Sequence, residues 1–158
     1  MRSGSTRGSR RRFVGVIGAS QCSRRAVEIA EEVGRGIAER GDIVVCGGLG
    51  GVMEAACRGA KQGGGITVGI LPGADRKAAN QYVDIPIATG FGSARNLVIV
   101  QSCDGLVAIE GGYGTLSEIA FASKLQVPMV GIRTWEVEVP LVRVRDAREA
   151  LRELYSKI

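Results

Sequence analysis

Short apolar runs that alternate with helical patterns constrain the fold of this chain more than any other feature. Valine and isoleucine dominate five such runs, at residues 13–17, 43–46, 66–70, 106–109 and 129–132, with a further candidate at 82–87. Each run is apolar on both faces, which is typical of parallel strands covered by helices on both sides. We therefore expect these runs to form one mainly parallel sheet.

Apolar residues between the runs recur at helical spacing. The patterns begin near residues 26, 53, 116 and 147, and the first two end at glycines. The segment 94–103 fits a strand or a helix, and we interpret it as a helix because strands flank it. The alternation predicts an α/β fold, a Rossmann-like three-layer sandwich in a single domain at 13–158, with ligands bound at the carboxyl ends of strands.

The net charge of +5 comes from the first twelve residues, which hold five arginines and no acid. The remaining chain carries 16 basic and 16 acidic residues, so we expect a neutral domain without a specific nucleic-acid partner, preceded by a disordered basic tail at 1–12. The stretch SRRRFVG resembles a twin-arginine export signal, but the apolar segment after it is short and fits the first strand better. No run approaches the length of a membrane span, so we expect a cytoplasmic protein.

The chain contains four cysteines and no histidine. The absence of histidine excludes Ser-His and Cys-His catalysis. The cysteines form no C-x-x-C pair, so we predict no metal site and no required cofactor. Any catalysis must use carboxylates, arginine, lysine, tyrosine or backbone amides.

Three glycine-rich loops follow three of the predicted strands, and each precedes a helical pattern. A helix N-terminus offers unpaired amides and a partial positive charge, and glycine lets an anion approach the backbone. Neither G-x-G-x-x-G nor the Walker A pattern is present, and βα turns favour glycine for structural reasons too. The predicted phosphate-binding residues are Gly18, Ser20, Gly47, Gly48, Gly51, Met53, Gly111, Gly112, Gly114 and Thr115.

The segments VCGGLGGVMEAA, GILPGAD, GSARN and EGGYGTLSE, in this order, resemble the family once labelled lysine decarboxylases. That family includes the Lonely Guy cytokinin-riboside-monophosphate phosphoribohydrolases and the molybdenum cofactor carrier proteins. The resemblance implies a Rossmann-like homodimer or higher homo-oligomer that takes a small phosphorylated ligand. It also implies that Arg95 and Glu118 match the catalytic pair of the enzymes. Asn96 and Glu110 replace their lysine and proline, and GFGSARN is closer to the carriers.

Glu118 has more than one interpretation. A carboxylate beside a ribose can stabilise an oxocarbenium-like transition state. Thr115 and Glu118 also form the T-x-x-E pattern of a helix capping box, and both roles can coexist. The leading hypothesis is a carrier-like protein that binds a nucleotide or pterin, with the molybdenum cofactor as a candidate ligand. The alternatives are a phosphoribohydrolase of purine nucleoside 5′-monophosphates and a non-catalytic nucleotide sensor.

Overall fold

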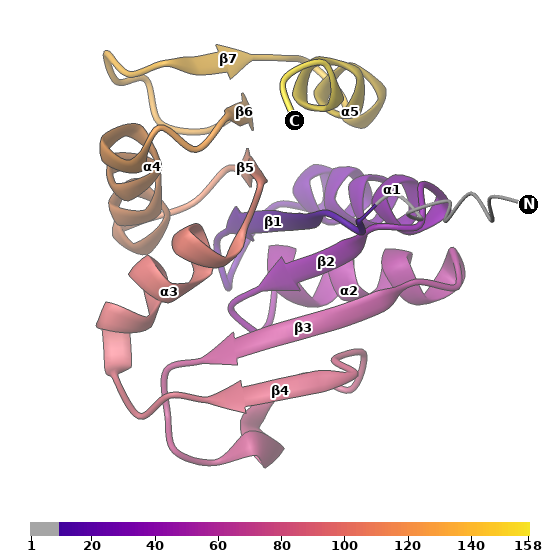
Figure 1. The fold of residues 1–158 in the computed structure, drawn as a ribbon, viewed down its shortest axis with the longest axis vertical. Coiled ribbons are helices and arrows are strands. Elements are labelled where there is room, and N and C mark those ends of the chain that lie inside the picture. The colour runs from indigo at the N-terminus through magenta and orange to yellow at the C-terminus, as the bar shows by residue number, and fades with distance from the viewer. Residues whose placement is uncertain (1–9) are drawn as a thin grey trace, which may run out of the picture.

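A parallel sheet forms the centre of the protein in the computed structural model, which describes residues 10–158. Within these residues, seven parallel strands are ordered β4-β3-β2-β1-β5-β6-β7 (Figure 1). The strands are β1 (Phe13–Gly18), β2 (Ile43–Cys46), β3 (Ile66–Leu71), β4 (Ile85–Ala88), β5 (Gly105–Ile109), β6 (Met129–Ile132) and β7 (Leu141–Arg143). The predicted mainly parallel sheet is confirmed.

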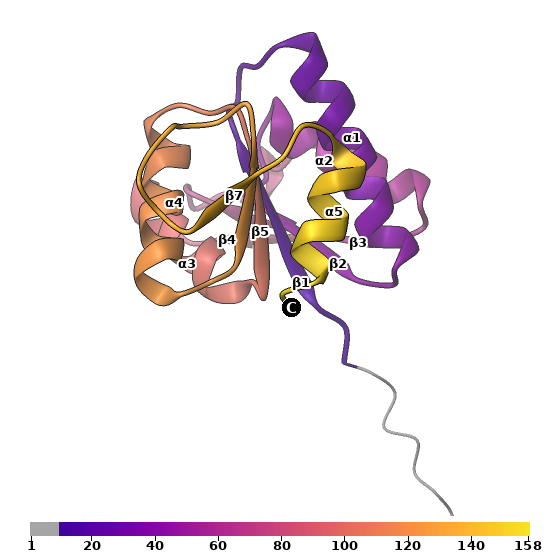
Figure 2. The same ribbon diagram turned by 90° about the horizontal axis from the view of Figure 1, so that it is seen from above.

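Helices cover both faces of this sheet, as the end-on view in Figure 2 shows. One face packs against α1 (Arg24–Glu39), α2 (Val52–Gln62) and α5 (Ala147–Tyr155). The other packs against α3 (Arg95–Ser102) and α4 (Tyr113–Leu125), and two short 3-10 turns lie at Arg76–Ala78 and Gly92–Ala94. The sandwich therefore has the three predicted layers, and the segment 94–103 is mainly a helix.

Alternation along β1 shows how the strands supply both cores. Val14 and Val16 face the α1 side, whereas Ile17 faces the α3 side, and all three are buried. On the α1 side, helices α1 and α2 pack so closely that a methyl group on Gly34 of α1 would overlap the backbone of Ala56 in α2. Small residues at this crossing let two helices share one face of the sheet.

Two strands differ from the sequence prediction. The candidate strand at 82–87 begins three residues later, because the Asn80 side chain accepts a hydrogen bond from the Tyr82 amide at 3.0 Å and holds a turn there. The strand β7 was not predicted, since it has only three residues, Leu-Val-Arg, and lies at the edge of the sheet.

The predicted basic tail, residues 1–12, lies largely outside the described residues. Of its last residues, Arg12 contacts the domain: its amide donates to Asp42 Oδ1 at 2.9 Å. The Tyr155 hydroxyl donates to Asp42 Oδ2 at 2.7 Å, so this carboxylate joins the start of β1 to α5. No helix in the described part of the chain is both long enough and apolar enough to cross a membrane.

Candidate functional site

A cleft of about 610 Å³ opens at the carboxyl ends of β1, β2 and β5. The strand order explains its position. From β1 the chain builds outward through β2, β3 and β4, and then crosses back to place β5 on the other side of β1. Loops on the two sides of β1 diverge at such a switch point, which leaves a crevice outside the strand ends. The cleft therefore lies where an open α/β sheet characteristically binds ligands.

The loop after β5 leads into the start of α4 at the edge of the cleft. Gly112 is the N-cap of α4, with no side-chain hydrogen bond to cap the helix. The first amides of a helix have no intrahelical acceptor, so those of α4 are available to a ligand. Gly111 has a φ of 112°, and a methyl group there would overlap the Thr115 side chain. This loop needs glycine at 111 for its own shape, whereas Gly112 has open space beside it.

The predicted capping box is wrong. The helix begins at Tyr113, so Thr115 is its third residue rather than its N-cap, and Glu118 lies in the second turn. Gly112 adopts an extended backbone that starts the helix without a side-chain cap, and Thr115 is buried beneath Gly111. The structure therefore excludes helix capping as a role of Glu118.

Glu118 is a buried carboxyl group that lines the cleft. Its exposed fraction is 6%, and among the described residues no donor makes a hydrogen bond to it. Burial raises the pKa of Glu118 from 4.5 to about 7, and the positive charge of Arg95 offsets part of this effect. The group is consequently poised to hold or release a proton near neutral pH.

Arg95 begins α3 and also lines the cleft. Its buried Nε has no hydrogen-bond partner within residues 10–158, while its Nη1 donates to the Asn96 side chain. A Cβ on Gly47 would lie 2.8 Å from Arg95 Nη2, so glycine at this position makes room for the guanidinium. Burial lowers the pKa of Arg95, and the charge of Glu118 partly opposes the shift.

A chain of hydrogen bonds links α3 to the first turn of α4. Asn96 is buried, and its Nδ2 donates to Ser117 Oγ at 3.1 Å. Ser117 Oγ in turn donates to the Gly114 carbonyl at 2.6 Å. Asn96, which stands where the phosphoribohydrolases have lysine, therefore orients Arg95 against the start of α4.

Most of the predicted site residues line the cleft. Those that do are Gly18, Ser20, Gly47, Met53, Arg95, Gly111, Gly112, Gly114, Thr115 and Glu118. Gly48 and Gly51 do not. Gly48 has a φ of 77° and packs against Leu71, and Gly51 has a φ of 64° with its α-carbon against the Ala19 and Ser20 backbone. Both glycines shape the walls behind the cleft.

Other lining residues were not predicted as ligand-binding residues. They are Ile17, Ala19, Gln21, Leu49, Asn96 and Glu110. Proximity to the glycine loops could have suggested Gln21 and Leu49, but nothing in their own pattern distinguishes them. The expectation that each loop opens directly into a helix holds for two of the three, since α1 begins only at Arg24 after its N-cap Ser23.

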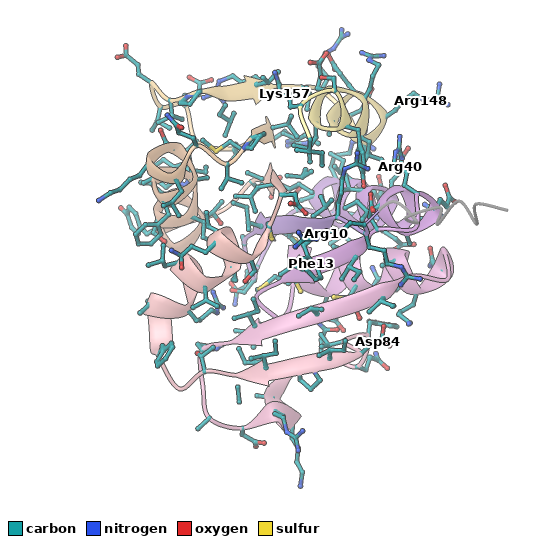
Figure 3. The ribbon with its side chains drawn as sticks, viewed as in Figure 1. Arg10, Phe13, Arg40, Asp84, Arg148 and Lys157 are labelled. Atoms are coloured by element: carbon teal, nitrogen blue, oxygen red, sulfur yellow. The ribbon has the colours of Figure 1, made fainter. Side chains whose placement is uncertain are left out.

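A second hollow, of about 380 Å³, lies between α1 and α5. Figure 3 labels two of its lining residues, Arg40 and Arg148, on the side of the molecule away from α4. Glu32 and Glu39 also line this hollow, so its lining is of mixed charge. It contains no glycine loop and no uncapped helix start. The cleft at β1 is the stronger candidate for a ligand site.

Comparisons with known proteins agree with this geometry. The model of the SLOG cluster4 family matches residues 11–156. A protein of Archaeoglobus fulgidus, described as uncharacterized, is 48% identical over 132 residues, which cover 78% of this chain and 87% of that protein. The molybdenum cofactor binding protein of the phototrophic bacterium Rippkaea orientalis has a similar structure, with a TM-score of 0.88 at 32% identity. That alignment covers 94% of this chain and 98% of the other.

The phosphoribohydrolase branch also matches. The cytokinin riboside 5′-monophosphate phosphoribohydrolase of Mycobacterium tuberculosis is 36% identical over 104 residues, which cover 64% of this chain and 56% of that enzyme. The chain thus spans about half the length of the phosphoribohydrolases that it matches. The family resemblance inferred from the glycine-rich segments is confirmed.

Proposed function

The chain belongs to the SLOG cluster4 family, and from that premise we propose that it binds a small phosphorylated ligand, a nucleotide or a pterin, in the cleft at β1, β2 and β5. The uncapped N-terminus of α4, which opens into this cleft, is the observation that carries the proposal. The similarity to a molybdenum cofactor binding protein favours a carrier-like role, with the molybdenum cofactor as a candidate ligand.

The phosphate would bind at the start of α4. Its first amides and the positive end of the helix dipole favour an anion. Gly112 has no Cβ and no atom within 4 Å of the place where one would be, so a phosphate can approach the backbone closely. Gly114 also lines the cleft and keeps the first turn of the helix accessible.

Arg95 would hold a second part of the ligand. Its side chain lines the cleft beside Glu118 and the start of α4. Arginine is suited to phosphate and hydroxyl oxygens, because its donors are arranged in a rigid planar fork. Asn96 fixes the orientation of this fork through its bonds to Arg95 and Ser117.

Glu118 favours a second candidate function, hydrolysis of the N-glycosidic bond of a purine nucleoside 5′-monophosphate. Its carboxylate lies in the same cleft as Arg95 and the start of α4, with no protein donor bound to it in the described residues. When ionised, such a group can accept bonds from ribose hydroxyls and stabilise the positive charge that develops on the sugar. Its pKa of about 7 leaves a substantial ionised fraction at neutral pH.

We further propose that the chain forms a homodimer through the exposed side of β4. Ile85 and Ile87 are 49% and 45% exposed, and Phe91 just beyond this strand is 64% exposed. Ile85 pairs with Val68 and Ile87 with Ile70, so both isoleucines extend the apolar sheet face that α3 and α4 cover elsewhere. An edge strand with an adjoining apolar patch is suited to an isologous contact with a second copy.

Ligand identification tests the proposed binding function. The protein would be purified under native conditions and unfolded, and any released small molecule would be identified by mass spectrometry. A pterin or nucleotide phosphate retained in stoichiometric amount supports the proposal. Titration calorimetry of ligand-free protein with AMP, with inorganic phosphate and with adenosine then tests the phosphate site. The proposal fails if no phosphorylated compound copurifies and neither AMP nor phosphate binds.

Base release separates the two candidate functions. Chromatography of an AMP reaction would show free adenine and ribose 5-phosphate if the protein is a hydrolase. A carrier or a sensor would bind its ligand and return it unchanged. Arg95→Lys is an informative variant in either case, because lysine keeps the charge but loses the planar fork.

A further inference from the structure

Glu110 has an unusual backbone conformation at the edge of the cleft. It follows β5 directly and has a φ of 50°, a value that non-glycine residues rarely adopt. Two bonds hold this conformation: its amide donates to the Ile132 carbonyl at 3.1 Å, and its carbonyl accepts from Thr134 Oγ1 at 2.6 Å. The neighbouring elements therefore enforce the direction in which Glu110 leaves the sheet.

The Glu110 carboxylate binds the N-terminus of α1. Its Oε1 accepts from the Ser23 amide at 3.1 Å, and its Oε2 accepts from Ser23 Oγ at 2.6 Å. Ser23 is the N-cap of α1, and its Oγ also accepts from the Ala26 amide at 3.1 Å. The carboxylate thus acts as a built-in anion at the positive end of this helix.

Glu110 carries its negative charge at neutral pH. Burial by itself raises the pKa of its carboxyl group, but the two hydrogen bonds from Ser23 and the charge of Arg133 together hold that pKa below its usual value. Arg133 Nε lies 3.7 Å from Oε2, and its side chain is largely exposed. Solvent therefore weakens this ion pair, and the carboxylate remains a source of negative potential in the cleft.

The position of Glu110 divides the anion-binding part of the cleft. The loop that leads to α1 (Ser20, Gln21) and the loop that leads to α4 (Gly111, Gly112) line the same cleft, and Glu110 lies between them. A single phosphate can use the α4 amides alone. Because Arg95 is assigned to the rest of the ligand, a second phosphate joined to the first would extend toward the α1 side, where the carboxylate already occupies the helix N-terminus.

We propose that Glu110 is a specificity-determining residue that restricts the cleft to ligands with one phosphate group and disfavours diphosphates. This inference rests on the proposed phosphate site at α4. The carboxylate repels a second phosphate and denies it the Ser23 donors. Glu110, which stands where the phosphoribohydrolases have proline, then affects which ligand the cleft binds.

Glu110→Gln tests the proposal, because glutamine removes the charge. Its Oε1 can still accept from the Ser23 amide, and its Nε2 can donate to Ser23 Oγ, which reverses the direction of that bond. Calorimetry would compare AMP with ADP, and inorganic phosphate with pyrophosphate, in wild type and variant. We expect wild type to bind the monophosphate of each pair more tightly. In the variant, the ratio of diphosphate to monophosphate affinity should rise by about tenfold, as expected when one nearby charge is removed from a partly buried site.

Glu149→Gln is the matched control. Glu149 lies in the first turn of α5, and its carboxylate accepts from the Arg145 amide at 3.0 Å. The substitution makes the same change in net charge outside the cleft, so the affinity ratio should stay at the wild-type value. Thermal unfolding of both variants shows whether either change alters the fold.

The inference is overturned if wild type binds diphosphates as tightly as monophosphates, or if Glu110→Gln leaves the ratio unchanged. An equal gain or loss of affinity for monophosphates and diphosphates would assign Glu110 a purely structural role, and this result also overturns the inference. Failure of the proposed function has a different signature, in which wild type binds none of the four probes.

Discussion

Replacing Gly112 by alanine tests the phosphate site directly, because the folded protein can accommodate the change. Gly112 has a φ of −101°, which alanine adopts readily, and an added Cβ would meet no atom within 4 Å. The neighbouring Gly111 offers no such test, since its φ of 112° and its contact with Thr115 would disturb the loop itself. Gly112→Ala therefore changes the surface offered to the ligand and little else.

The expected loss of affinity follows from the bonds that a methyl group would block. A hydrogen bond to a charged group contributes about 1.5–3 kcal/mol, so losing one amide–phosphate bond should weaken phosphate binding by about 10- to 150-fold. The effect on stability should be small. Alanine is a poorer N-cap than glycine, but it also reduces the entropy of the unfolded chain, and these opposing effects are each about 1 kcal/mol or less.

Calorimetry with AMP and with adenosine measures the effect. The variant should lose affinity for AMP while adenosine binding stays nearly constant, because adenosine has no phosphate to meet the new methyl group. Gly73→Ala is the matched control: Gly73 is exposed, has no atom within 4 Å of its added Cβ, and lies outside the cleft. Unchanged AMP affinity in Gly112→Ala, or equal losses for AMP and adenosine, would refute the phosphate site at α4.

Two further predictions concern the buried carboxylate and the sheet edge. Because the pKa of Glu118 is raised from 4.5 to about 7, the native state binds this proton more tightly than the unfolded state does. The wild-type free energy of unfolding should therefore fall by about 3 kcal/mol relative to that of Glu118→Gln as the pH rises through this interval. Urea denaturation of both proteins at about pH 4 and about pH 8 measures this difference. Parallel pH profiles of the two proteins would contradict the buried environment assigned to Glu118. At the sheet edge, Ile87→Glu should convert the dimer into a monomer, as measured by light scattering. Leu125→Glu is the control, because Leu125 is an exposed apolar residue at the end of α4, and this variant should remain a dimer. A monomeric wild type would contradict the proposed interface.

Local patterns were sufficient to predict the architecture. Runs of valine and isoleucine without polar alternation require a sheet covered on both faces, and the helical repeats between them supply the cover. The same patterns placed three glycine loops at one edge of the sheet, because parallel strands end on the same side. Arg95 and Glu118 could be identified as catalytic candidates only through the family resemblance, since Arg95 has no distinctive local pattern and the T-x-x-E pattern at Glu118 indicates a helix cap.

Tertiary structure decided what each candidate residue can do. Thr115 and Glu118 have the spacing of a capping box, yet an extended Gly112 starts the helix earlier and leaves Glu118 in a buried wall, where loss of solvent raises its pKa. The role of Glu110 was equally hidden, because its partner Ser23 lies 87 residues away in the chain. Sequence periodicity is a local property, whereas burial, desolvation and long-range hydrogen bonds exist only once distant segments pack together.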